Sequence, residues 1–286
     1  MRYRTAESFR QALEDRLREE NRRSGLPLDH LRKRVAFERF VARLYPPEQD
    51  LSASPFVVKG AFALVQRIQT RRTTKDLDLA LLEEKTDPLD VLLDVAERDA
   101  GDFFHFQVSA RTRDRPQEPG ARRFAVEASL AGRRFEGFNL DVVTEPLGDE
   151  SVEVLELPPR LDFAGVPGTR VRAISPPRHY ADKLHAYTRP RKYRSRVKDL
   201  IDLALLTLEL EGDPRAPATI LAEIEKVFDL YATHELPELL PRPPGDWKAS
   251  FKAMAKEAGL EPPDLDVWFD RANIFYEKLK ANSAQS

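Results

Sequence analysis

The chain has 286 residues, of which 41% are hydrophobic and 33% are charged, and it contains no cysteine. Such a composition is that of a highly charged globular protein, and it excludes disulfides, thiolate chemistry and cysteine-bound zinc. The net charge of −2 argues against a protein that coats nucleic acid over its whole surface. No apolar run reaches the roughly 20 residues of a membrane span. The first residues also lack an apolar signal core, so we expect no membrane association and a cytoplasmic protein.

Two amphipathic helices are predicted at the start of the chain. The first covers residues 7–23, where apolar side chains recur every four positions. The second runs from about residue 29 to residue 45, with Asp29 as a plausible N-cap and a broad apolar face. We interpret the pair as a cap on the core. A DNA-binding helix-turn-helix is the alternative, which the long linker and the apolar second helix disfavour.

The segment 56–82 is the centre of the functional prediction. It begins with a short buried strand at 56–58. Lys59 and Gly60 come next, and a helix is predicted over 61–69. Gly60 permits a tight turn and the close approach of a phosphate group. The exposed amides and the dipole of the helix N-terminus favour an anion at the same place, and Lys59 adds a positive charge. The segment therefore predicts a phosphate-binding turn.

A strand with two acidic residues, Asp76 and Asp78, follows the basic loop 71–75. Because side chains alternate along a strand, the two carboxylates lie on one face, with Leu77 and Leu79 on the other. Neighbouring carboxylates repel each other, so folding gains nothing from this placement. A divalent cation such as Mg²⁺, which takes one or two carboxylates together with substrate phosphates, would turn the pair into a site. A solvent-facing strand end with two ordinary acids is the alternative.

These residues resemble the first motif of a known family. The pattern G-x-x-A-L, followed by R-x-T-x-D-L-D-L from Arg72 onwards, is similar to that of the AbiEii-type toxins, which include the MenT toxins. The family usually has a second glycine where this chain has Ala61. The resemblance implies a nucleotidyltransferase with an α/β (α+β), DNA-polymerase-β-like fold, from a type IV toxin–antitoxin system. It also implies that Thr74 supplies the hydroxyl of the family's Ser/Thr-x-Asp pair.

A helix over 88–100 and three β-rich segments extend the predicted sheet. The β-rich segments are 103–110, 124–130 and 135–144, and a hairpin is predicted between the last two. In the last segment Asp141 lies on the face opposite Leu140 and Val142. In the DNA-polymerase-β-like fold a later strand supplies a third carboxylate, and the resemblance implies Asp141 for this position. A polar residue of an edge strand is the alternative.

A second motif lies on a helix that begins at Pro176-Pro177, after two short strands within 152–174. The sequence A-x-K-L-x-A at 181–186 resembles the family's lysine motif. The resemblance implies that Lys183 neutralises phosphate charge. A lysine that extends from the border of an apolar helix face into solvent is the alternative.

Positive charge is concentrated between Val171 and Asp199. We count nine Lys and Arg residues there against two acids, and Tyr187 and Tyr193 offer stacking surfaces. Such a segment fits an RNA or DNA backbone, although a solvated basic loop has the same composition. The Lys198-Asp199 pair at the end of the segment resembles the family's third motif, which implies a functional acid at Asp199.

The remaining chain reads as helical. Helices are predicted at 200–210 and at 217–231. A proline-rich link then leads to a helix that begins at Trp247, and the last helix is predicted at 264–280. The five histidines show no ligand spacing, and we assign none of them to a metal. We predict three parts: an N-terminal helical cap at 1–50, a nucleotidyltransferase core with a mixed sheet at 51–175, and a helical C-terminal region at 176–286 that completes the active site.

The predicted reaction is the transfer of a nucleoside monophosphate from an NTP to an acceptor hydroxyl. Asp76 and Asp78 would hold Mg²⁺ (or Mn²⁺), which bridges triphosphate oxygens and offsets developing charge. Phosphate contacts are assigned to the side chains of Lys59, Arg72, Thr74 and Lys183 and to the turn at Gly60. Either Asp141 or Asp199 completes the metal shell or orients the attacking hydroxyl.

The resemblance implies the 3′ ends of tRNA as acceptor, with a block of translation, and a cognate antitoxin as partner. The segment 171–198 agrees with an RNA substrate. Two other functions are open: nucleotidylation of a protein target, and nucleic-acid binding by a regulator without enzymatic activity.

Overall fold

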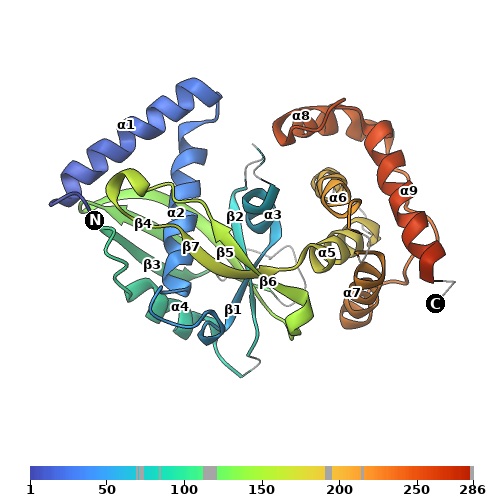
Figure 1. Cartoon of the computed structure of the whole chain (residues 1–286), viewed down its shortest axis with the longest axis horizontal. Helices are drawn as coiled ribbons and strands as arrows, with labels where there is room; N and C mark the ends of the chain where they lie inside the picture. Colours follow the sequence, from blue (N-terminus) through green and yellow to red (C-terminus); the bar gives the residue numbers. More distant parts are fainter. Residues whose placement is uncertain are drawn as a thin grey trace. The chain divides into compact units, whose positions relative to one another are not determined.

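The computed structural model describes residues 1–68, 70, 74–83, 85–111, 121–190, 195–213 and 216–283. These residues divide into two compact units, whose elements are labelled in Figure 1. The first unit contains Met1–Arg67, the described part of 73–148, and Val152–Ala173. The second contains residues 68 and 70, Asp149–Ser151, and the chain from Ile174 onwards. None of the described helices combines the length and the apolarity needed to cross a membrane.

Two long helices open the first unit. They are α1 (Ala6–Ser24) and α2 (Leu28–Leu44), close to the predicted bounds. Pro27 occupies the cap position of α2, so Asp29 is not its N-cap. Asp29 lies instead in the first turn, where its negative charge faces the positive end of the helix dipole.

A seven-stranded mixed sheet forms the core of the first unit, in the order β3-β4-β5-β2-β1-β7-β6. The strands are β1 (Phe56–Lys59), β2 (Asp76–Leu81), β3 (Phe104–Ala110), β4 (Arg122–Leu130), β5 (Arg133–Thr144), β6 (Val152–Leu157) and β7 (Thr169–Ile174). β2 is antiparallel to β1 and parallel to β5, while β7 is parallel to β1. α3 (Gly60–Ile68) joins β1 to β2, and α4 (Pro88–Glu97) precedes β3. The predicted α/β class with a mixed sheet is confirmed.

One face of the sheet is apolar and is covered by α1, α2 and α4. Phe37 and Phe40 of α2 meet the ring of Phe138 on β5 at centroid distances of 4.7 and 5.9 Å. Leu77 and Leu79 of β2 are fully buried in the same cluster. Burial of each such leucine stabilises the fold by about 1.5–3 kcal/mol. Alternate positions on β2 therefore point to the opposite face of the sheet, where the acidic residues lie.

The second unit is helical, as predicted for the C-terminal region. Its helices are α5 (Pro176–Thr188), α6 (Val197–Leu210), α7 (Ala216–Tyr231), α8 (Lys248–Ala258) and α9 (Leu265–Ser283). α5 packs against α6 and α7, and α9 also packs against both (Figure 1). Ser175 caps α5 by accepting a hydrogen bond from the backbone N–H of Arg178, and prolines occupy the first turn. This cap fixes the start of the helix that carries Lys183.

Candidate active site

Four charged residues form a row across the sheet face opposite α2. Asp78 on β2 is paired directly with Lys59 on β1 and with Asp141 on β5, and Asp141 is paired with Arg123 on β4. Residues paired in this way point to the same side of a sheet, with Cβ atoms roughly 5 Å apart. The order along the row is cation, acid, acid, cation. Negative charge is therefore concentrated at its centre.

Asp76 lies two residues before Asp78 on β2 and therefore on the same face. Its Oδ1 accepts a hydrogen bond of 2.9 Å from Nδ2 of Asn139 on β5. Thr74 donates its hydroxyl to the backbone carbonyl of Asp76 at 2.9 Å. Asp76 and Asp78 are both half-buried, so a ligand can reach them. Two accessible carboxylates on one face are the hard oxygen donors that Mg²⁺ prefers.

Gly60 places the carboxylate of Asp78 against the turn between β1 and α3. Gly60 has a φ of +65°, and a Cβ at this position would lie only 2.0 Å from Oδ2 of Asp78. Only glycine permits both this backbone conformation and this close approach. The sequence predicts that a phosphate approaches Gly60. In the structure the Asp78 carboxylate itself lies against this glycine, so the turn and the acid form one local unit.

Asp141 is held by Arg123. The guanidinium donates from Nε to Oδ1 at 2.7 Å and from Nη2 to Oδ2 at 2.6 Å, a bidentate pair in which both carboxylate oxygens are used. Asp141 is 8% exposed. Within the part of the chain that the structure describes, no three acidic or histidine side chains are arranged to hold a metal ion. Binding of a cation by Asp76 and Asp78, with or without Asp141, stays a prediction.

Lys59 has a buried partner at the other end of the row. Its Nζ lies 2.9 Å from Oε2 of Glu145, and the two side chains are only 2% and 1% exposed. A buried ion pair of this kind is costly to break, because removal of one partner leaves an uncompensated charge. Contact between Lys59 and a nucleotide phosphate stays a prediction.

Lys183 and Asp199 belong to the second unit. Nζ of Lys183 on α5 lies 3.0 Å from Oδ2 of Asp202 and 3.6 Å from Oδ1 of Asp199, both on α6. Arg196 donates to Oδ2 of Asp199 at 2.9 Å. Asp202 is fully buried, while the Lys183 side chain is 18% exposed. Of the two acids, Asp202 is the nearer ionic partner of Lys183.

The basic segment 171–198 is only partly described. Residues 191–194 and Arg72 lie outside the described residues, so the predictions for them have no structural account here. Within the described part, Arg178 is buried and lies 3.1 Å from Asp182. Some of the positive charge that the sequence assigns to nucleic acid is therefore used inside the protein.

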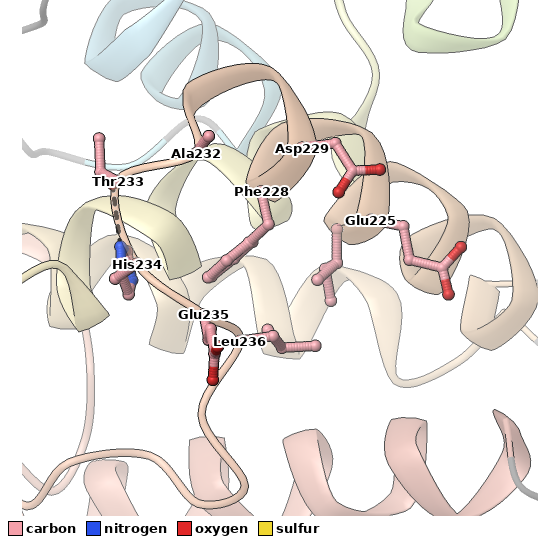
Figure 2. Close-up of a pocket in the computed structure, with 9 residues that line it drawn as sticks. Glu225, Phe228, Asp229, Ala232, Thr233, His234, Glu235 and Leu236 are labelled. Carbon is pink, nitrogen blue, oxygen red and sulfur yellow. Dashed lines mark hydrogen bonds between the residues drawn. The ribbon is translucent and has the colours of Figure 1, made fainter.

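A pocket of about 660 Å³ lies at the end of α7 and is lined in part by residues 232–236 (Figure 2). Oγ1 of Thr233 is 2.8 Å from Nε2 of His185 and 3.0 Å from Nδ1 of His234. Burial, and then the charge of Arg189, lowers the pKa of His234. These rings are held by hydrogen bonds to a threonine hydroxyl. The spacing of the histidines in the sequence does not reveal this network, because helix packing creates it.

The comparison with protein families decides the identity. The model of the nucleotidyl transferase AbiEii toxin, type IV toxin–antitoxin system, matches residues 43–271. The chain belongs to the AbiEii family. It is therefore a nucleotidyltransferase and a member of a toxin family, and the resemblance inferred from the motifs is confirmed.

Solved structures resemble this AbiEii-family chain in fold. MenT4, a nucleotidyltransferase toxin from Mycobacterium tuberculosis H37Rv, is 18% identical with a TM-score of 0.54, covering 88% of this chain and 84% of that one. A protein from H. pylori assigned as a nucleotidyltransferase is 17% identical with a TM-score of 0.49, covering 90% of this chain and 98% of that one. At its level of identity, the likeness to MenT4 concerns the fold. No protein with a curated description matches the sequence.

Proposed function

We propose that this AbiEii-family enzyme transfers a nucleoside monophosphate from an NTP to the 3′-terminal hydroxyl of tRNA. The observation that carries the proposal is the pair Asp76 and Asp78, accessible on one face of β2 beside Gly60. In the reaction the acceptor oxygen forms a bond to the α-phosphorus, and the P–O bond to the bridging oxygen breaks. Pyrophosphate leaves with the electron pair, and the acceptor's proton passes to a base or to water.

Asp76 and Asp78 would hold Mg²⁺ or Mn²⁺ through their carboxylate oxygens. A cation bound there would offset the charge of the triphosphate and of the departing pyrophosphate. The hydrogen bond from Asn139 orients Asp76, and the absence of a Cβ at Gly60 leaves room for the Asp78 carboxylate. Both carboxylates are thereby positioned before a substrate arrives, which lowers the cost of reorganisation during the reaction.

Asp141 and Asp199 remain the two candidates for the third acidic group. Asp141 neighbours Asp78 in the sheet, but it must exchange a bond with Arg123 before it can bind a cation. Asp199 lies beside Lys183, which would place an acid and a phosphate-binding cation in one cluster. Either acid would complete the metal shell or orient the acceptor hydroxyl.

We assign the phosphate contacts to cationic and hydroxyl-bearing side chains and to the backbone of Gly60. The assigned residues are Lys59, Gly60, Arg72, Thr74 and Lys183. The described cations among them are paired with internal carboxylates, so binding of a triphosphate would require partner exchange. A triphosphate carries enough negative charge to compete for such cations, since hydrogen bonds between charged groups are the strongest available.

The segment 171–198 is proposed to contact the RNA backbone, with translation and growth blocked in the cytoplasm as the outcome. Membership of a type IV toxin–antitoxin family makes a cognate antitoxin the expected partner. We retain the proposed division into a cap at 1–50, a catalytic core at 51–175 and a C-terminal region at 176–286 that completes the site.

One assay tests the proposed function. The full chain is incubated with each labelled NTP in turn, with Mg²⁺ and total tRNA, and the reaction is repeated with Asp76→Ala. A matched control is Asp94→Ala, which removes an exposed acid of α4. We expect label on RNA with the wild type and with Asp94→Ala, and its loss with Asp76→Ala.

Other outcomes separate the alternatives. Label on protein that Asp76→Ala abolishes would replace tRNA by a protein acceptor. Absence of label with every NTP, together with salt-sensitive RNA binding that Asp76→Ala retains, would indicate a nucleic-acid-binding protein without transferase activity.

A further inference from the structure

A cavity of about 590 Å³ opens in the first unit, away from the row of carboxylates. Its walls come from the end of α2 and from residues 46–51, 98–100 and 166–170. Tyr45 lines it and donates its hydroxyl to the carbonyl oxygen of Phe56, the first residue of β1. Asp78, by contrast, is paired with Lys59, the last residue of β1. The cavity and the candidate active site therefore lie at opposite ends of β1.

Two buried arginines of α2 that line this cavity, Arg39 and Arg43, share the buried carboxylate of Asp102. Arg43 donates to both oxygens of Asp102, at 3.1 and 2.7 Å, and to the carbonyl oxygens of Arg39, Arg98 and Phe104. All three nitrogens of its guanidinium are thereby bonded. Arg39 reaches the same carboxylate through Nε, at 2.6 Å. Burial acts to raise the pKa of Asp102, but its bonds to Arg43 and the charge of Arg39 outweigh burial and lower this pKa.

The cluster has more positive charge than negative. Two guanidinium groups face one carboxylate, although the three side chains are no more than 8% exposed. Within the described residues, hydrogen bonding of the Arg39 side chain is confined to Nε, so neither terminal amino group has a protein acceptor. Buried charges are normally paired and hydrogen-bonded, because desolvation without a partner is costly. Arg39 therefore presents two donors to the cavity that it lines.

Further cations line the same cavity, together with apolar side chains. Arg98 and Arg170 line the cavity, as do the acids Glu48 and Asp99. Apolar side chains complete the lining: Tyr45, Pro46, Pro47, Leu51, Val166 and Pro167. A volume of this size is in the range of small-molecule sites, which are mainly apolar with a few polar groups that fix orientation.

We propose that this cavity binds a small organic phosphate, with its phosphate on the terminal amino groups of Arg39 and its apolar or aromatic body against the proline-rich wall. A carboxylate has two oxygens, which a single guanidinium fork satisfies. A phosphate has three peripheral oxygens and accepts donors from more than one arginine. The presence of Arg98 in the same cavity as Arg39 therefore favours phosphate.

Phenyl phosphate is a suitable probe, because it lacks the base and sugar that a nucleotide site recognises. Isothermal titration calorimetry of the full chain, with a chelator and without NTP, is expected to give a Kd on the order of 10–100 μM. Two variants alter the cavity: Arg39→Lys, which removes the fork, and Ala100→Trp, which fills the mouth from an exposed position. Each is expected to weaken binding tenfold or more. Arg18→Lys, at an exposed arginine of α1, is the matched control and leaves the Kd unchanged.

The proposal is overturned if Ala100→Trp binds phenyl phosphate as tightly as the wild type, or if phenol binds equally well. Benzoate binding tighter than phenyl phosphate would overturn the preference for phosphate. Should Arg39→Lys fail to fold, Ala100→Trp decides, since Ala100 is exposed and its replacement removes no buried contact. Asp76→Asn is expected to keep the same Kd. If Asp76→Asn changes the Kd as much as Ala100→Trp does, phenyl phosphate binds at the active site and not in this cavity.

Discussion

The two ends of β1 hold opposite excess charge. At the end of β1 that carries Lys59, which we call the acidic end, the register of the sheet places Asp78 beside Asp141. Asp76 lies on the same strand face as Asp78. Near the other end of β1, which begins at Phe56 and which we call the basic end, the guanidinium groups of Arg39 and Arg43 share the carboxylate of Asp102. At the first end like charges repel each other, and at the second end two buried cations share a single anion. The contrast agrees with the two proposals made above, a cation at the first end and an anion at the second.

The largest expected effect is at the acidic end. Asp78→Asn keeps the shape of the side chain and removes its charge, so nucleotidyl transfer is expected to fall about 10³-fold or more, or about 4 kcal/mol of transition-state stabilisation. The same change relieves repulsion with Asp76 and Asp141, so the melting temperature is expected to stay the same or to rise. Initial rates of label transfer and thermal unfolding measure the two effects. A strong loss of stability would show that Asp78 acts mainly as a structural residue.

At the basic end the expected effect is on stability rather than on rate. Asp102→Asn leaves Arg39 and Arg43 without their shared carboxylate, which is expected to reduce the free energy of unfolding by about 3–5 kcal/mol. Urea unfolding measures the loss, with Asp94→Asn as the exposed control. Transfer activity per folded molecule is expected to stay near the wild-type level. A stability equal to that of the control would contradict the role given to the buried cluster.

The pH dependence of stability gives the same interaction a second test. Because the pKa of Asp102 is lower in the folded protein than its ordinary value, the folded state binds the proton less readily than the unfolded chain does. Its contribution is therefore fully present above the ordinary value of about 3.9 and is lost as pH falls toward the folded pKa. The difference in unfolding free energy between wild type and Asp102→Asn is expected to shrink below about pH 4. A difference that grows there would reverse the sign and refute the pKa shift.

Gly60→Ala is expected to have an intermediate effect on both rate and stability. A left-handed φ costs a non-glycine residue about 1–2 kcal/mol, and the new Cβ forces the Asp78 carboxylate to move. A displacement of about 1 Å in a reacting site can reduce the rate about 10²-fold. Gly25→Ala separates these terms, because Gly25 also has a positive φ but nothing lies within 4 Å of its Cβ position. Equal losses of activity in the two variants would rule out the contact with Asp78 as the cause.

Much of the acidic end could be predicted from the sequence. The glycine after a buried strand and the alternation of Asp76, Leu77 and Asp78 are local patterns, and the strand–helix–strand order that they predict is present. The family motifs added the toxin nucleotidyltransferase identity, which the comparison confirms. Local patterns succeed here because each depends on side chains within a few residues of one another.

The bond between Arg123 and Asp141 could not be predicted in this way. Counting outward from the hairpin turn at residues 131 and 132 would pair Arg123 with Leu140, on the apolar face. A register shift at Ala128 and Ser129 moves the pairing by one residue, so that Arg123 meets Asp141. A one-residue slip changes the face of every later side chain, and a bulge is rarely evident from the sequence.

The cluster of Arg39, Arg43 and Asp102 at the basic end could not be predicted from the sequence, for a different reason. Arg39 and Arg43 are four residues apart on α2, which by itself predicts only a charged helix face. Their partner Asp102 lies about 60 residues further on, in the loop before β3. Long-range packing of a loop on a helix leaves no periodic signal. A pair of arginines within an otherwise apolar helix face was the only available indication.

The smallest expected effect addresses the third acidic group. Arg123→Met keeps much of the side-chain length and removes the charge that holds Asp141, so this carboxylate becomes available next to Asp78. If it joins the cation site, the Kd for Mn²⁺ without nucleotide is expected to fall about 30-fold, since one more negative charge at about 4 Å from a divalent cation is worth roughly 2 kcal/mol in water. Electron paramagnetic resonance of free Mn²⁺ measures this change, and the double variant Arg123→Met with Asp141→Asn removes it. Binding that Arg123→Met leaves unaltered would exclude Asp141, and Asp199 would then be the acid that acts with Asp76 and Asp78.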